Sequence, residues 1–588
     1  MLGLARSEQV FATSSRLRSL SASALSPAAM KLARCTPLPA APLALTRLTS
    51  PSEAAPRLSP PLLAALGVAL ALLLLSAVWT HRGASRAALQ ALSSRSKTAR
   101  RHLGHSHAGE KLSHIPAPPV VTIPRHIQLS EAGHEAYARA LEEHGDVIVV
   151  PRHGRLEYVV DYQHVKDVLT DSQRFSFEEA VTRMLHMRFM LWFKQGTFVS
   201  ELDRLVQDGI NPRLNAVVDK VSPIFVQEVE ELFEKHATAG AASEVVIENL
   251  YSWVHRGIAR AMVVLILGER YLDEKMTQRF MAVVGAIADL SGIYENTHGW
   301  AWAPALWSLK TTLGAICFTI VPQFFFSIVP LLWRNRESHL NAGLDVDSTA
   351  FAPFFDLLAA RHRNRVTDQL SFLNFVWCAV VCLGIIFASV HQSAVMAVWC
   401  IANLAKRPEY IDEIRAEFDE VLETDAEGKS VLGLEGLRRS EKLDSFIREV
   451  LRTNSSLFAP VRYTTEPVRV GKYLIPKDAL VAPYIKRAHE LGDGAAGKGA
   501  SFDGRQWVGV KAAVTGDAAF ITFGLGRWAC PGRQLAIAEL KMITGILFAH
   551  YDVVLDGDEL VPGDAMNRTS VGPTNTARIR KRAGGITA

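Results

Sequence analysis

The chain has little cysteine, and what it has lacks the spacings in which cysteines act together. Its 588 residues include six cysteines, at positions 35, 317, 378, 382, 400 and 530, and no two of them form a CxxC pair. These spacings exclude a disulfide framework and a zinc site built on paired cysteines. They favour a reducing, cytosol-facing compartment. Each cysteine therefore has to be judged by its own surroundings.

A strong excess of one charge is also missing. The 64 lysines and arginines exceed the 59 acidic residues by so little that the formal net charge is +5. With no basic patch interleaved with aromatic residues, the sequence predicts no nucleic-acid partner. Hydrophobic residues make up 49% and charged residues 21% of the chain, which is typical of a largely globular protein. The length allows one large domain or several ordinary ones.

The first 61 residues predict a disordered or targeting-like extension. Residues 1–50 carry six basic side chains and a single acid, Glu8. Arginine-rich, acid-poor composition is typical of a mitochondrial transit peptide. Prolines from Pro27 to Pro42 interrupt any long amphipathic helix, and they favour a plain disordered extension.

An apolar segment at residues 62–79 predicts a transmembrane anchor. It has no charge and one polar side chain, Ser76, and its length meets the usual minimum of ~18 residues. Basic residues that follow from Arg82 predict a cytosolic location for that side. The segment begins too far into the chain for a secretory signal. Residues 80–119 form a basic linker that closes on the stiff proline hinge Ile115-Pro-Ala-Pro-Pro119.

The remaining chain, residues 120–588, reads as one domain. Strands are predicted at 147–150 and 156–160, a short helix at 161–169, and longer helices at 213–236 and 248–268. A sheet rich in hairpins is predicted at 468–484. Two further apolar blocks, 313–333 and 377–399, have a composition that by itself also allows membrane spans.

One cysteine lies in an unusual setting, the stretch Phe523-Gly-Leu-Gly-Arg-Trp-Ala-Cys530-Pro-Gly532. The glycines allow conformations that other residues resist and let a flat ligand come close. Apolar residues at helical spacing follow, so Cys530 is predicted at a helix N-terminus, where a thiolate is favoured. Such a thiolate can be an axial ligand of haem iron. A lone buried cysteine is the alternative interpretation.

This stretch resembles the cysteine loop of the cytochrome P-450 superfamily of haem-thiolate monooxygenases, in the fungal variant that ends Cys-Pro-Gly-Arg. The resemblance implies a mainly helical fold with a small β region, preceded by the single N-terminal transmembrane helix. It implies haem b (iron protoporphyrin IX) with Cys530 as the metal ligand. The loop residues implied to bind the cofactor are Phe523, Gly526, Arg527, Trp528 and Gly532. The loop departs from the family at Trp528, where a propionate-binding Arg or His usually stands.

Other family landmarks lie upstream. Glu449 and Arg452 match the Glu-x-x-Arg pair that locks the core on the cysteine side, and they share a helix face; taken alone, the pattern also fits an ordinary surface ion pair. Arg462 matches a propionate partner. The resemblance gives Arg505 the role of a second arginine for Glu449 through a local shift, because Gln506 stands at the usual position.

The stretch Ala388-Ser-Val-His391-Gln392-Ser393 falls where the family helix crosses the distal face of the haem. The resemblance implies that Ala388, His391 and Gln392 line the oxygen pocket. The usual proton-delivering threonine is Gln392 here, and Ser393 lies about 100° around the helix. For His391, a satisfied core histidine is the alternative. In the family, the block at 313–333 lies between two helices that cover the substrate entrance and dip into lipid, which favours a monotopic segment.

The resemblance therefore predicts a monooxygenase that inserts one atom of O2 into a small apolar molecule, in fungal secondary metabolism of terpenoids or polyketides. Electrons would come from NADPH through NADPH-cytochrome P-450 reductase. The predicted location is the endoplasmic reticulum membrane, with the catalytic domain cytosolic, in preference to a mitochondrial membrane. Gln392 leaves open an isomerase, dehydratase or peroxygenase that needs no reductase. A catalytically silent haem-binding membrane scaffold and a multi-span transporter are further alternatives.

Overall fold

A computed structural model describes residues 114–582, with gaps at 125–126, 128–131, 153–154, 185–196, 237–243, 297–303, 346, 348, 425–429, 455, 459, 492–500 and 563–570. The targeting-like extension, the predicted anchor at 62–79 and the linker as far as residue 113 lie outside the described residues. The proline hinge, Ile115 to Pro119, lies within the described residues. Pro116 accepts a hydrogen bond from Leu474 N, and Pro119 accepts one from Val149 N, so both prolines are joined to the β region.

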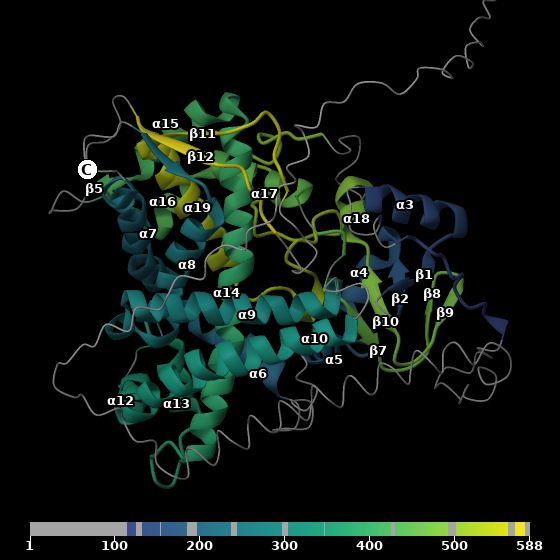
Figure 1. Ribbon diagram of the computed structural model, residues 1–588, viewed down its shortest axis with the longest axis horizontal. Coiled ribbons are helices and arrows are strands. Elements are labelled where there is room, and N and C mark those ends of the chain that lie inside the picture. The colour runs from purple at the N-terminus through teal and green to yellow at the C-terminus, as the bar shows by residue number, and fades with distance from the viewer. Residues whose placement is uncertain are drawn as a thin grey trace, which may run out of the picture. The chain divides into compact units, whose positions relative to one another are not determined.

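The described chain is mainly helical (Figure 1). The first helices are α3 (Ala132–His144), α4 (Tyr162–Thr170), α5 (Phe177–Met184), α6 (Phe198–Gly209), α7 (Leu214–His236), α8 (Leu250–Leu267), α9 (Glu274–Asn296), α10 (Pro304–Leu313), α11 (Val329–Arg334), α12 (Arg336–Asp345) and α13 (Phe354–Arg361). Then follow α14 (Phe372–Ala405), α15 (Ile411–Val421), α16 (Leu434–Arg439), α17 (Glu441–Thr453), α18 (Ile485–Leu491) and α19 (Arg533–His550). Short 3-10 turns are η4 (Asn211–Arg213), η5 (Glu269–Tyr271), η7 (Pro408–Tyr410) and η8 (Gly526–Trp528), and η6 (Gly314–Ile328) is a π-helix.

The strands form two main sheets and two hairpins. Their bounds are β1 (Val147–Arg152), β2 (Arg155–Val160), β3 (Phe175–Ser176), β4 (Glu244–Ile247), β5 (Glu423–Thr424), β6 (Ser430–Val431), β7 (Arg462–Thr464), β8 (Val468–Val470), β9 (Tyr473–Ile475), β10 (Leu480–Pro483), β11 (Tyr551–Leu555) and β12 (Ala577–Lys581). One sheet has the order β1-β2-β10-β7-β3, antiparallel except for the parallel pair β2–β10. The other has the order β11-β12-β4. The mainly helical fold with a small β region is therefore confirmed.

The centre of the helical part is α14, a helix of 34 residues. The Ser371 side chain caps it by accepting a hydrogen bond from Asn374 N. The helix carries apolar side chains on most of its faces, as a helix packed by neighbours on several sides does. It packs against α8, α9 and α19 within the largest hydrophobic core cluster. Figure 1 shows α14 running between these helices, away from the sheet that contains β1 and β2.

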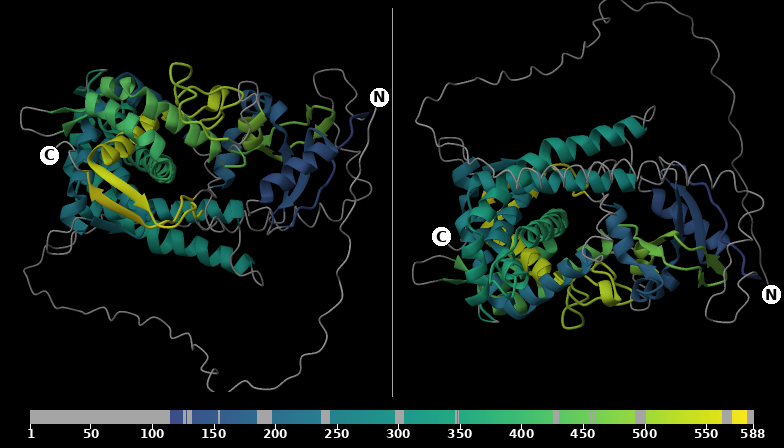
Figure 2. Two further views of the ribbon diagram at one scale, coloured as in Figure 1. Left: turned by 90° about the horizontal axis from the view of Figure 1, so that it is seen from above. Right: turned by 90° about the horizontal axis from the view of Figure 1, so that it is seen from below.

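The apolar block predicted as a connection between two helices is itself helical. α10, η6 and α11 run continuously from Pro304 to Arg334, so this expectation was wrong. η6 packs along α9, and Figure 2 shows the two long helices side by side. Pro322 is accommodated inside the wide turns of η6, where the Ser327 hydroxyl donates to the Pro322 carbonyl at 2.8 Å.

Three described helical segments have the length and composition of membrane spans. They are Leu250–Leu267, Leu306–Arg334 and Phe372–Ala405, which are 78%, 50% and 50% buried within the protein. Leu306–Arg334 still presents large apolar side chains to the outside, most of all Phe318, which is 79% exposed, and Phe326, which is 50% exposed. This outer face differs from the charged face that a surface helix usually carries.

Candidate active site

The cysteine loop ends just before α19, whose N-cap is Gly532. Cys530 therefore lies two residues before the cap and not within the first helical turn. Its backbone N–H donates to the Phe523 carbonyl at 2.7 Å, and its own carbonyl accepts from Arg533 Nη1 at 2.9 Å. These two bonds fix the backbone of Cys530 from both sides.

Gly526 brings the loop close to the end of α4. Its φ is +70°, which an L side chain rarely adopts. A Cβ atom there would lie 2.9 Å from Thr170 Cα and 3.1 Å from the Leu169 carbonyl oxygen. The positive φ and the close approach to α4 thus require glycine at position 526, independently of what the loop binds.

The Cys530 thiol has a raised pKa, chiefly because it is buried. The Gly532 backbone N–H and the charge of Arg533 act in the opposite direction, and the charge of Asp203 adds to the increase. A metal cation bound to the sulfur would replace the thiol proton, because the thiolate is the form that coordinates metals.

The middle of α14 presents a face that other described residues leave open. Ala388 and Gln392 are exposed there, although both neighbouring turns of the helix are largely buried. His391 lies differently: it is 2% exposed, and its Nδ1 is 2.9 Å from the Tyr251 hydroxyl on α8. The structure therefore places Ala388 and Gln392 on an open face and directs His391 toward α8.

Arg462, at the start of β7, is a buried cation without a described counter-ion. It is 2% exposed, and its Nη1 donates to the Pro460 carbonyl at 2.6 Å. Among the described residues no hydrogen-bond partner exists for Nε. Burial lowers the pKa of Arg462 to about 10. A carboxylate of a bound ligand would supply the missing acceptor and the missing charge.

Arg527 and Trp528 lie in η8, on the cysteine loop. Arg527 Nη1 is 2.5 Å from Asp203 Oδ2 on α6, and the guanidinium lies over the Trp528 ring at 4.7 Å. Trp528 also contacts the Phe177 ring, with centroids 5.5 Å apart. The propionate role implied for Arg527 stays a prediction, and Asp203 is a partner that the sequence did not suggest.

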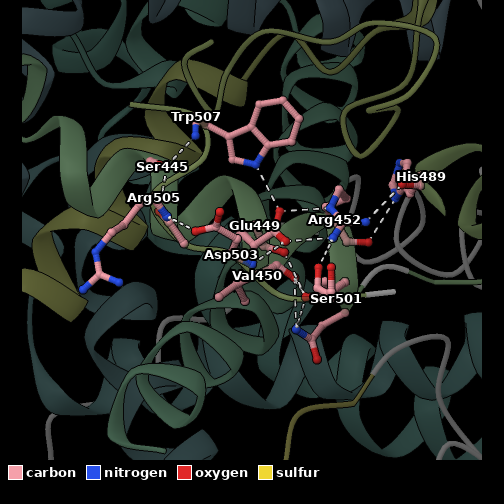
Figure 3. A network of polar contacts seen from close by, with 12 residues as sticks. Ser445, Glu449, Val450, Arg452, His489, Ser501, Asp503, Arg505 and Trp507 are labelled. Atoms are coloured by element: carbon pink, nitrogen blue, oxygen red, sulfur yellow. Dashed lines mark hydrogen bonds and ion pairs between the residues drawn. The ribbon is translucent and has the colours of Figure 1, made fainter. Parts of the chain in front are cut away.

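Glu449 and Arg452 form a buried ion pair on α17 (Figure 3). Arg452 Nε donates to Glu449 Oε2 at 2.9 Å and Nη2 to Oε1 at 2.7 Å, with the two side chains 0% and 3% exposed. The same carboxylate accepts from Asp503 N and from the indole Nε1 of Trp507, each at 3.0 Å. Every oxygen of this buried carboxylate therefore has two donors.

The role expected for Arg505 was wrong. Its guanidinium turns away from Glu449, as Figure 3 shows, and its Nε pairs with Glu413 Oε1 at 2.8 Å. Trp507 takes the place expected for the second arginine, because the turn that contains both residues directs Trp507 inward. An indole N–H supplies one donor and no charge.

His489 joins this cluster to the cysteine loop. Its carbonyl accepts from Arg452 Nη1 at 3.1 Å, and its Nε2 accepts from Ile521 N at 2.8 Å. Burial lowers the pKa of His489 to about 4, which keeps the ring neutral and Nε2 able to accept. No motif pointed to His489, because the contact joins residues far apart in sequence.

These residues fit a haem. Cys530 would supply a sulfur ligand, Arg462 a buried cation whose Nε has no acceptor among the described residues, and Ala388 and Gln392 an open face of α14. Unmet charge and hydrogen-bonding capacity of this kind is what a carboxylate-bearing, iron-containing ring would satisfy. The Glu449–Arg452 cluster lies on α17, and His489 joins it to Ile521, two residues before the cysteine loop.

Comparisons with known proteins agree with this arrangement. A sequence model of the family described as "Cytochrome P450" matches residues 115–577. Cytochrome P450 714D1 of Oryza sativa subsp. japonica is 32% identical over 389 residues, covering 64% of this chain and 63% of the relative. A cytochrome P450 monooxygenase 3 of Gibberella fujikuroi is 31% identical, covering 31% of this chain and 38% of the relative.

Both relatives are thus matched over less than two thirds of their own lengths. Two solved structures share the fold at 17% identity. The retinoic acid-bound cyanobacterial CYP120A1 has a TM-score of 0.57, with 80% of this chain and 100% of that chain covered. The cytochrome P450DA heme domain has a TM-score of 0.59, with 80% and 98% covered.

Proposed function

The chain belongs to the cytochrome P450 family, and from that premise we propose that it is a haem-thiolate monooxygenase with Cys530 as the iron ligand. The observation that carries the proposal is a cysteine fixed by its backbone together with a buried Arg462 that lies over the Phe177 ring, which in turn contacts Trp528 of the cysteine loop. Relatives from three fungi, Gibberella fujikuroi, Postia placenta and Aspergillus flavus, bear the name monooxygenase. The proposed reaction inserts one atom of O2 into a small apolar substrate.

A haem, when bound, supplies the iron that activates dioxygen. The Phe523 carbonyl and Arg533 hold the backbone of Cys530 so that its sulfur keeps one direction. Arg462 would offer N–H donors to a propionate at a buried position, where such a pair is stronger than in water. These residues would bind and orient the group.

On the open face of α14, Ala388 would leave room for close approach of dioxygen, because its side chain is a single methyl group. Gln392 presents an amide that can donate to oxygen or hold a water, but an amide neither gains nor loses protons near neutral pH. The preceding residue, His391, is directed toward α8, where its Nδ1 is bonded to the Tyr251 hydroxyl. Proton delivery in this chain therefore depends on water or on groups other than the residue at 392.

Gln392 supports a second candidate, a haem-thiolate isomerase, dehydratase or peroxygenase that draws no electrons from a reductase. The two candidates differ in their requirements. The monooxygenase needs NADPH and NADPH-cytochrome P-450 reductase, whereas the alternative turns over without either. Product formed by the purified protein with its substrate alone, or with peroxide alone, would favour the alternative.

For the substrate we propose an apolar small molecule of fungal secondary metabolism, a terpenoid or a polyketide. The Cys-Pro-Gly-Arg ending of the loop supports a fungal type, and relatives from Gibberella fujikuroi, Postia placenta and Aspergillus flavus are similar to this chain. Plant relatives are similar as well, and one of them is named beta-amyrin 11-oxidase. That name supports a polycyclic, largely hydrocarbon substrate.

For the location we propose a single-pass anchor at residues 62–79 in the endoplasmic reticulum membrane, with the catalytic domain in the cytosol. The uncharged anchor segment and the basic residues after it support this orientation. The apolar outer face of Leu306–Arg334 supports a second, monotopic contact with lipid. Protease protection of the membrane-bound chain tests the topology, since a cytosolic domain is digested without permeabilising the vesicles.

The absorbance spectrum of the reduced, carbon monoxide-bound protein tests the haem-thiolate assignment on which the proposed function depends. We expect a red-shifted, thiolate-type band in the wild type, its loss in Cys530→Ser and its retention in Cys317→Ser, a second partly buried cysteine. Equal spectra for the wild type and Cys530→Ser would refute the ligand assignment. A biological effect that survives Cys530→Ser would instead favour the silent scaffold.

A further inference from the structure

Asp203 is a buried acid beside the cysteine loop that no motif explains. It lies in the middle of α6, and its side chain is 7% exposed. A buried carboxylate is stable only when it is paired and hydrogen-bonded. Asp203 meets both conditions. Gln207 Nε2, one turn further along the helix, reaches its two oxygens at 3.1 and 3.2 Å, and Arg527 Nη1 reaches Oδ2 at 2.5 Å.

The contact with Arg527 joins two distant parts of the chain at the metal ligand. α6 packs next to the loop, because a Cβ placed on Gly532 would lie 3.7 Å from Val206 Cγ1. Arg527 is 48% exposed, whereas Asp203 is almost fully covered. The acid is therefore the fixed member of the pair, and the arginine is the member that reaches it from the solvent side.

The negative charge of Asp203 lies close to the loop that carries Cys530. Its partner Arg527 is three residues before Cys530, and Val206, one turn further along α6, packs at Gly532, two residues after Cys530. A negative charge buried this near an iron bound to Cys530 would disfavour an added electron there, because both add negative charge in the same poorly solvated place. Arg527, on the solvent side of the pair, acts with the opposite sign.

We propose that Asp203 is a positioning residue that lowers the reduction potential of the cysteine-bound iron and fixes Arg527 against α6. This inference rests on the proposed haem-thiolate function. It makes α6 a source of negative charge on the cysteine side of the ring, and it leaves Arg462 as the principal buried cation for a propionate. The proposed role concerns the electron-accepting step, before any substrate is oxidised.

The test is the midpoint potential of the haem-loaded full chain, measured by spectroelectrochemistry. Asp203→Asn keeps a side chain of similar shape and removes the charge. We expect it to raise the ferrous-to-ferric ratio at a fixed potential by about tenfold, which is about 59 mV for one electron. Asp203→Glu, which keeps the charge, is expected to stay near the wild-type potential.

Asp208→Asn is the matched control. Asp208 lies on the same helix, its side chain is 57% exposed, and it pairs with Arg361 at 2.8 Å. We expect no shift in its potential. A purely structural role for Asp203 predicts a lower melting temperature without a change in potential, so equal potentials for Asp203→Asn and the wild type would overturn the proposal, as would an equal shift in Asp208→Asn.

Arg527→Gln keeps the inference testable if Asp203→Asn does not take up haem. It removes the positive partner and leaves the carboxylate in place, so the potential is expected to fall. A rise in Arg527→Gln would overturn the proposal. If the wild type itself lacks the thiolate-type band, the proposed function fails. If the band is present and the variants leave the potential unchanged, only the role of Asp203 fails.

Discussion

Glu539 gives the sharpest prediction about stability. It lies on α19, is 2% exposed, and among the described residues its Oε1 has no hydrogen-bond partner. Burial raises the pKa of Glu539 to about 8, and a hydrogen bond from Ser393 only partly offsets that effect. The folded protein therefore holds this carboxyl in its protonated form at neutral pH.

The sign of the effect follows from linkage. The folded-state pKa is above the ordinary value of 4.5, so the stability contributed by the protonated carboxyl is fully present below pH 4.5. It is lost as the pH rises through 8, because the unfolded chain releases the proton first. With about 1.4 kcal/mol per pKa unit, this group should make the free energy of unfolding about 4 kcal/mol lower at pH 9 than at pH 5.

Glu539→Gln removes the titration and keeps the shape. We expect the difference in unfolding free energy between the wild type and this variant to change by about 4 kcal/mol between pH 5 and pH 9, measured by urea unfolding with tryptophan fluorescence. Glu420→Gln, at an exposed position on α15, should show no such change. Parallel pH profiles for the wild type and Glu539→Gln would refute the reasoning.

Three further predictions follow from named contacts. Burial lowers the pKa of His489 to about 4, so its neutral ring contributes about 3 kcal/mol to the free energy of unfolding above pH 6.5, and this contribution is lost as the pH falls through 4. His489→Gln should therefore flatten the fall in melting temperature between pH 7 and 4.5. An unchanged pH profile would contradict this prediction. Trp507→Phe removes a hydrogen-bond donor to the buried Glu449 carboxylate and should lower the free energy of unfolding by about 1–3 kcal/mol. Arg505→Ala should change it by less than about 0.5 kcal/mol. Equal losses for the two variants in urea unfolding would argue against the hydrogen bond from Trp507 as a stabilising contact. Gln392→Thr should raise product formed per NADPH and lower peroxide release if proton delivery is merely weakened, and no improvement would assign Gln392 a role of its own.

The sequence predicted best what is local. Glu449 and Arg452 lie three residues apart on one helix, so helical geometry alone brings them together. Cys530 stands between two glycines and a helix start that can be recognised in a short window. The strands β1 and β2 and the helices α7 and α8 also lie where periodicity placed them, because side-chain alternation reports burial directly.

The sequence predicted poorly what depends on the direction of a turn or on distant packing. Arg505 and Trp507 are two positions apart, and only the path of the turn decides which one faces Glu449. Asp203 meets Arg527 across 324 positions, which no periodicity can indicate. The block at 313–333 was expected between two helices, yet it is itself helical and packs along α9.

The indole of Trp507 has an electrostatic consequence beyond its hydrogen bond. A carboxylate shared by two arginines would leave one surplus positive charge inside the protein, whereas Glu449 with Arg452 and Trp507 sums to zero. The cluster thus fixes α17 without adding a net charge to the interior of the protein. Charged side chains close to the cysteine loop include Asp203 on α6 and Arg533 on α19. Substitutions that remove these two charges are therefore expected to shift the reduction potential of a bound iron in opposite directions, whereas the neutral Glu449 cluster contributes little.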